Sequence, residues 1–225
     1  PSLLLIAEHH IDCEDYTSAK TYIDRVTKVN PWNPEAWAFR SAMDFINNDS
    51  SESKQSREKA LKYWSNNPKV DYLIGIKISQ KYLFNIGAEH QRKALEFDKN
   101  YQPSKIQLAQ DMLRLGQEEE GWKLAEEVYN KDKYNIMAYN LVNLRDHLAT
   151  FTTIQSGGFI VKMDKREAIA YGHEVIDLLE KAEKDLCEKY GAKLENPVIL
   201  EYFPDQQDFA VRTFGEPGGD GFLGV

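Results

Sequence analysis

The chain has 225 residues, of which 42% are hydrophobic and 28% are charged, a composition typical of a globular protein with one or two domains. The net charge of −8 disfavours nucleic acid and anionic membranes as partners. No apolar run approaches the length of a membrane span.

Cysteine usage says little about the compartment. Cys13 and Cys187 lie far apart and form neither a metal-ligand spacing nor a disulfide framework, which slightly favours a reducing, cytoplasmic location. Because the chain begins with Pro1, we expect it to be excised from a longer protein, and a removed signal peptide is compatible with the sequence.

A pattern of large and small residues recurs about every 34 residues over the first two-thirds of the chain. Its first copy predicts a helix over Leu3–Ile11 and a second over Tyr16–Val29, ended by Pro31. The pattern restarts at four later positions: Trp37, Gly75, Ala109 and Tyr139.

The second unit begins at Asn33-Pro34, since asparagine can cap a helix and proline suits its first position. The polar run Asn47–Ser53 predicts an inserted, solvated loop. The helix after this loop is expected to end before Pro68 and to carry Ala60, Leu61 and Trp64.

Two further units are predicted over Val70–Lys99 and Gln102–Lys133. Their helices are expected to be joined by turns at Asn85-Ile86-Gly87 and Leu115–Gly121. A final helix over Met137–Leu148 has no partner of its own kind and is interpreted as the last rung of the stack. Small residues at helix crossings allow close packing, and stability comes from contacts between neighbouring units.

This layout resembles the tetratricopeptide-repeat (TPR) family, with a generic helical bundle as the alternative. The resemblance implies that residues 1–148 form an α–α superhelix whose concave groove binds partners. The positions that would line this groove are Leu4, Glu8, Ala38, Ala42, Tyr72, Ile76, Ile106, Gln110, Asn140 and Leu144. The last six are our candidate site.

The candidate set is mostly apolar with a few amides. It lacks the Lys/Asn cluster with which chaperone-binding TPR proteins hold a carboxylate, so a chaperone tail is disfavoured. An open apolar face needs a cover, which is either a protein or peptide ligand or the chain's own C-terminal module.

After Leu148 the pattern changes. Phe159–Met163 predicts a strand, and a helix over Lys165–Tyr190 follows, with Asp164 as its cap. One stripe of this helix carries Ile169, Ile176, Leu179 and Leu186, and Gly191 ends it.

Pro197–Phe203 predicts a second strand, so the segment reads as a βαβ-like unit, although antiparallel pairing is also compatible. Asp205 is expected to cap a helix that continues to Phe214, and Gly215–Gly221 predicts a flexible connection. The fold class is therefore mostly α, a TPR-like superhelix followed by a small α/β segment over residues 149–225.

This second segment resembles the opening of the peptidase-MA-like (gluzincin) zinc metallopeptidase domain found after TPR arrays in some bacterial proteins. The matching stretches are Phe159–Asp164, the long helix, Pro197–Pro204 and Asp208–Gly215. In that family an H-E-x-x-H motif and a later Glu bind zinc. This chain stops before such a motif, which removes the ligands and the general base.

Histidines do not supply a metal site. His173 has Asp177 where a zinc helix would have its second histidine, and no third ligand is placed, so His173 is expected to be a partly buried helix residue. We predict partner recognition without catalysis and without a cofactor in this chain. The alternatives are a substrate-positioning arm of a zinc metallopeptidase, with zinc in the longer parent, or a purely structural buttress.

Overall fold

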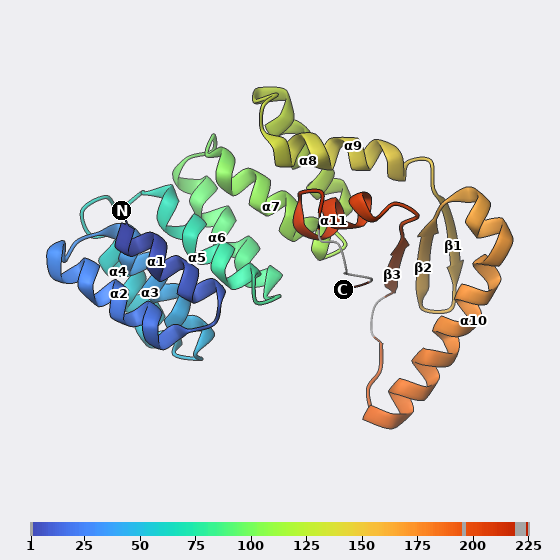
Figure 1. Cartoon of the computed structure of the whole chain (residues 1–225), viewed down its shortest axis with the longest axis horizontal. Coiled ribbons are helices and arrows are strands. Elements are labelled where there is room, and N and C mark those ends of the chain that lie inside the picture. Colours follow the sequence, from blue (N-terminus) through green and yellow to red (C-terminus); the bar gives the residue numbers. More distant parts are fainter. Residues whose placement is uncertain (1, 195–196, 219–223, 225) are drawn as a thin grey trace. The chain divides into compact units, whose positions relative to one another are not determined.

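The computed structural model describes residues 2–194, 197–218 and 224, which divide into two compact units over residues 1–128 and 129–225. The first unit is a succession of antiparallel helix pairs (Figure 1). Its elements are α1 (Ser2–Asp12), α2 (Tyr16–Val29), α3 (Pro34–Ile46), α4 (Ser50–Ala60), α5 (Pro68–Ser79), α6 (Phe84–Phe97), α7 (Gln102–Arg114) and α8 (Glu118–Lys131), the last of which crosses the division. This confirms the TPR-like arrangement.

The repeat is regular from the start of the chain. The first helices of successive pairs begin at Ser2, Pro34, Pro68 and Gln102, a spacing of about 34 residues. Caps explain two of these starts, because the side chains of Asn33 and Asn67 accept hydrogen bonds from backbone N–H groups in the first turns of α3 and α5.

Small residues lie where the two helices of a pair cross. A Cβ atom added at Gly75 would lie 2.9 Å from the carbonyl oxygen of Gly87, and one at Gly121 would lie 3.0 Å from that of Ala109. In the second pair, Ser41 and Ser53 take these places, and the Ser41 hydroxyl donates to the Ser53 carbonyl at 2.8 Å. The predicted role of small residues is therefore confirmed.

One predicted turn, Asn85-Ile86-Gly87, was placed wrongly, and the other two are right only in their first three residues, Asn47–Asp49 and Leu115–Gln117. The run Asn47–Ser53 is not an insertion, because α4 begins at Ser50 behind the cap Asp49 and buries Ser53. Leu61 and Trp64 follow α4 rather than belonging to it. Asn85-Ile86-Gly87 lies in the first turn of α6, and Glu118–Gly121 lies in the first turn of α8.

The second unit contains α9 (Ile136–Leu148) and a three-stranded sheet with two helices (Figure 1). The other elements are β1 (Thr152–Ser156), β2 (Phe159–Met163), α10 (Lys165–Tyr190), β3 (Val198–Tyr202) and α11 (Gln206–Phe214). The strands lie in the order β1-β2-β3. Strand β1, which the threonine-rich sequence did not reveal, pairs antiparallel with β2.

The βαβ interpretation is confirmed, because β2 and β3 pair in parallel with Val161 opposite Leu200. Asp164 caps α10, and Gly191 ends it with a φ of 63°. Gly172 lets α10 approach the sheet, since a Cβ there would lie 2.6 Å from Cδ1 of Ile154.

The predicted apolar stripe of α10 is only partly buried. Ile176 packs in the sheet core, whereas Ile169 and Leu186 are exposed. His173 is also exposed, so its predicted partial burial was wrong. The reason is that the short strands cover only part of a 26-residue helix.

The domain boundary expected between residues 148 and 149 concerns which segments fold independently, and it stays a prediction. Of the predicted connection Gly215–Gly221, residues 219–221 lie outside the described part of the chain.

Candidate partner-binding face

Four of the six candidate residues lie on two neighbouring first helices of the first unit. Tyr72 and Ile76 are on α5, Ile106 and Gln110 are on α7, and the two helices contact each other. Ile106 is buried, while the other three are half-buried and reach solvent. We call these four residues the α5–α7 face.

A tyrosine pair flanks this face. The rings of Tyr72 and Tyr101 meet edge to face with centroids 5.8 Å apart. Burial, followed by the charge of Glu8, raises the pKa of Tyr72. Burial, with Tyr72 as the next contributor, raises the pKa of Tyr101 to about 12. Both phenols therefore stay neutral near pH 7 and can donate hydrogen bonds.

The predicted groove does not continue over α3. Ala38 and Ala42 have no exposed surface, so they cannot line an open groove. The ammonium of Lys77 on α5 lies 2.9 Å from Glu8 and 2.7 Å from Asp12, both on α1. Ion pairs thus join α5 to α1, and Ala38 and Ala42 are buried within the chain.

The last two candidates, Asn140 and Leu144, lie on α9 in the second unit. Asn140 donates a hydrogen bond from Nδ2 to the carbonyl oxygen of Gly215 at 3.1 Å, and α9 packs against α11. Leu144 is buried. Within that unit, both residues already contact their own chain.

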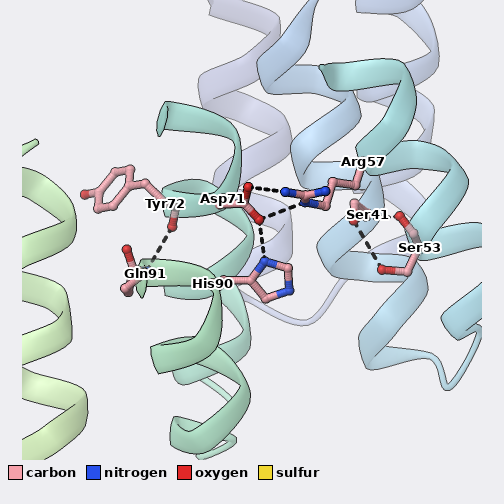
Figure 2. A network of polar contacts seen from close by, with 7 residues as sticks. All are labelled: Ser41, Ser53, Arg57, Asp71, Tyr72, His90 and Gln91. Atoms are coloured by element: carbon pink, nitrogen blue, oxygen red, sulfur yellow. Dashed lines mark hydrogen bonds and ion pairs between the residues drawn. The ribbon is translucent and has the colours of Figure 1, made fainter. Parts of the chain in front are cut away.

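Asp71, which precedes Tyr72 in the sequence, is the centre of a buried ion-pair network (Figure 2). Asp71 accepts hydrogen bonds from Nε and Nη2 of Arg57 at 2.8 and 2.6 Å, and lies 2.7 Å from Nδ1 of His90. Gln91 donates to the Tyr72 carbonyl at 3.2 Å. The network links α4, α5 and α6 and therefore fixes the backbone from which Tyr72 projects.

The electrostatics of Asp71 follow from this geometry. Burial alone would raise the pKa of its carboxyl, but the hydrogen bonds and charges of His90 and Arg57 bring that pKa below its usual value. Asp71 is fully buried and is held as a carboxylate. The contacts of Asp71 with Arg57 and His90, which we call a clamp, therefore hold α4, α5 and α6 together next to the α5–α7 face.

A second buried carboxyl lies next to Gln110 in sequence. Asp111 is 1% exposed, and its Oδ1 accepts a hydrogen bond from Gln107 at 3.0 Å. Burial raises the pKa of Asp111 to about 7, because the polar groups of Gln107, Ser79 and Arg114 offset the loss of water only in part. This residue can change its protonation state near neutral pH.

Sequence reasoning missed these buried and half-buried polar residues, although their positions in the repeat could have revealed them. Arg57 and Gln91 fall where Ile23 lies in the first pair, and Lys77 and Asp111 share one repeat position. A polar residue at a position that is apolar in another repeat predicts a buried partner.

Neither a metal cluster nor a membrane-spanning helix is found in the described part of the chain. Within residues 2–194, 197–218 and 224, no group of three His, Cys, Asp or Glu side chains has the geometry to hold a metal ion. No helix in the same residues has the length and apolar character needed to cross a membrane.

Similarity to known proteins is limited to the fold. No protein-family model matches the chain, and no curated protein does so either. Among solved structures, it resembles YrrB, described as a TPR protein with an unusual peptide-binding site, with 15% identity over 63% of this chain and 73% of YrrB and a TM-score of 0.40. It also resembles PilF of Pseudomonas aeruginosa, with 13% identity over 86% of this chain and 93% of PilF and a TM-score of 0.45. These similarities are too distant to transfer a ligand.

Proposed function

We propose that this chain binds a protein or peptide partner through the α5–α7 face. The observation that supports this most is the placement of Tyr72, Ile76 and Gln110, all half-buried, on two helices that contact each other. Each of them keeps part of its side chain available, and the hydrogen bond from Gln91 to the Tyr72 carbonyl holds the backbone at Tyr72.

The chemistry of the face suits a partner segment with both apolar and polar groups. Ile76 offers apolar surface, while the Tyr72 phenol and the Gln110 amide can hydrogen-bond to a peptide backbone. None of the four residues carries a charge at neutral pH. Association is therefore expected to depend weakly on salt, unlike binding to nucleic acid.

The test is the double variant Tyr72→Ala with Ile106→Ala, which truncates a half-buried aromatic side chain on α5 and a buried apolar side chain on α7. Partner retention in a pull-down should fall strongly, while the helical circular dichroism signal at ambient temperature should remain. Tyr134→Ala is the matched control, because Tyr134 is highly exposed and lies in the second unit. Unchanged retention by the double variant would remove the proposal.

A second proposal makes the α5–α7 face the substrate-positioning arm of a zinc metallopeptidase whose zinc site lies outside this chain. The parallel β2–α10–β3 unit supports it, since the peptidase-MA-like resemblance implies a strand–helix–strand unit ahead of the zinc helix. The sequence of the parent gene and the zinc content of its product test this. An H-E-x-x-H motif soon after residue 225 would favour it, and a parent without one would exclude it.

A purely structural role as a buttress is the remaining alternative. Removal of residues 149–225 separates it from partner binding. If the remaining helix pairs stay folded and keep their partner, buttressing is not their function.

A further inference from the structure

A cluster of exposed aromatic rings lies away from the α5–α7 face, on the loops that join one helix pair to the next. Trp32 lies between α2 and α3, and Tyr63 and Trp64 lie between α4 and α5. Their exposed fractions of 45%, 70% and 57% are high for such large side chains. Packing within the chain does not bury these three ring surfaces.

The two loops come together through ring contacts. The Trp32 and Tyr63 rings meet edge to face with centroids 5.0 Å apart. The indole N–H of Trp37 donates to the Pro31 carbonyl at 2.7 Å, and the Trp32 backbone N–H donates to the Asn30 side chain at 3.1 Å. These bonds fix the first loop, so the rings are presented by an ordered backbone.

Lysines accompany the rings. The Lys62 ammonium lies 3.9 Å from the centroid of Trp32 and 5.6 Å from that of Tyr63, and the Lys59 ammonium lies 4.5 Å from that of Trp37. In the described part of the chain, neither ammonium has a carboxylate within ion-pair distance. We call Trp32, Lys59, Lys62, Tyr63 and Trp64 the loop patch.

The loop patch is therefore cationic and aromatic in a chain of net charge −8. Other lysines of this unit, such as Lys69 and Lys77, are neutralised by carboxylates at 2.7 to 2.9 Å. A lysine held over a ring instead keeps its charge available to an incoming anion.

A small cleft next to the loop patch limits the size of the group that can enter there. Trp37 and Lys59 help to line a cavity of about 160 Å³, together with Asp24, Arg40 and Glu52. This volume is below the range of about 300–1,000 Å³ that small-molecule sites occupy, but it is large enough for a single side chain. The carboxylates of Asp24 and Glu52 would repel an anion inside this cleft, so the acidic group of a ligand is expected outside it, at Lys62.

From this geometry we propose that the loop patch docks an acidic peptide segment in which a carboxylate lies next to an aromatic or large apolar side chain. The carboxylate pairs with Lys62, and the apolar side chain packs on Tyr63 and Trp64. A sugar ring is disfavoured, because Lys62 already covers the face of Trp32. The patch shares no residue with the α5–α7 face, so the two proposals can fail separately.

The test uses short synthetic peptides that alternate Asp or Glu with Phe or Leu, added to the full chain. Binding is followed by the indole N–H resonance of Trp32 and by fluorescence anisotropy of a labelled peptide. We expect a shift of that resonance and weaker binding at high salt. Lys62→Gln should weaken binding about five-fold, the upper end for an exposed ion pair.

Lys99→Gln is the matched control, since Lys99 is an exposed lysine of the same unit and lies outside the loop patch. It should bind as the unaltered chain does. The proposal is overturned if the Trp32 resonance does not move or if Lys62→Gln and Lys99→Gln bind alike. Equal binding of peptides with Gln in place of Asp and Glu would also overturn it, as would tighter binding of an oligodeoxythymidine, which would identify a nucleic-acid contact.

Discussion

The helices α5 and α7 both bury charge, but they treat it differently. On α5, Asp71 meets Arg57 and His90, and Lys77 meets two carboxylates of α1. On α7, Asp111 occupies the repeat position of Lys77 and accepts a hydrogen bond from the Gln107 amide at 3.0 Å, and its polar surroundings offset the cost of burial only in part. Ion pairs therefore hold the buried charges of α5, whereas on α7 burial favours the neutral, protonated form of the Asp111 carboxyl.

The comparison shows that the position of a residue in the repeat determines whether its side chain is buried. It does not determine which charge the side chain carries or how that charge is paired. A charge at such a position is stable only if the neighbouring repeat supplies a partner. The α5–α7 face lies across the clamped helix and the unclamped one, so its two halves should respond differently to mutation and to pH.

The largest expected effect comes from Asp71→Ala. The change leaves Arg57 and His90 beside a buried site without their carboxylate, and should lower the free energy of unfolding by about 3–5 kcal/mol. Urea denaturation followed by circular dichroism measures it. A loss below about 1 kcal/mol, the value of an exposed ion pair, would show that the clamp is not structural.

Gly75→Leu should destabilise next, by about 3 kcal/mol, because α5 and α6 touch at this point. Even a Cβ atom there would lie 2.4 Å from Nε2 of Gln91 and 2.9 Å from the carbonyl of Gly87. The equivalent position on α7 is already Ala109. A melt in which Gly75→Leu unfolds at the same temperature as the unaltered chain would contradict the helix-crossing assignment.

Asp111→Asn should change stability in the opposite direction. A carboxyl whose pKa is raised to about 7 on folding binds its proton more tightly in the folded state, so its contribution is complete below about pH 4 and is lost as the pH rises through about 7. The amide of this variant would stay neutral at every pH, and we expect a gain of about 2 kcal/mol at about pH 8 and little change at about pH 4.

Asp71 provides the control for this pH dependence. Its pKa is lowered on folding, so its contribution is present above the unfolded pKa of about 3.9 and disappears as the pH falls through the folded value. Unfolding free energies measured across this range should therefore show two opposite slopes in the unaltered chain. Asp111→Asn should remove only the upper one, and its persistence would assign that slope to another group.

The smallest effect is expected for Lys77→Met, which replaces a buried ammonium by an apolar chain of similar length. Glu8 and Asp12 are each more than one-third exposed and can return to water, so stability should change by less than about 1 kcal/mol. Thermal unfolding in parallel with Asp71→Ala checks this. A loss as large as that of Asp71→Ala would show that both clamps on α5 are essential.

Much of the fold could be predicted from the sequence, because the repeat sets helix length, caps and crossings together. Asn33, Asp164 and Gly191 act as their local chemistry predicts. The error at Asn47–Ser53 arose because polarity was taken to mean a loop, whereas Ser41 and Ser53 bury their hydroxyls against each other. Strand β1 was not predicted, because its exposed residues are polar and its pairing depends on the neighbouring strand β2.

The candidate face could be predicted only in part. The TPR resemblance identified Tyr72, Ile76 and Gln110 by their place in the repeat. It could not show that Lys77 would reach α1, because that depends on a long side chain crossing between repeats, nor that Ala38 and Ala42 would be fully buried.

Partner binding by the α5–α7 face is tested most directly by site-specific photo-crosslinking in cells. A benzoylphenylalanine placed at Ile76 or Gln110 should give an adduct with another protein, and an equivalent group at Tyr134 should not give it. Tyr72→Ala should reduce that adduct. If the groups at Ile76 and Gln110 crosslink only to residues 149–225 of their own chain, or give no adduct absent from the Tyr134 control, the face is covered internally or unused, and the account is wrong.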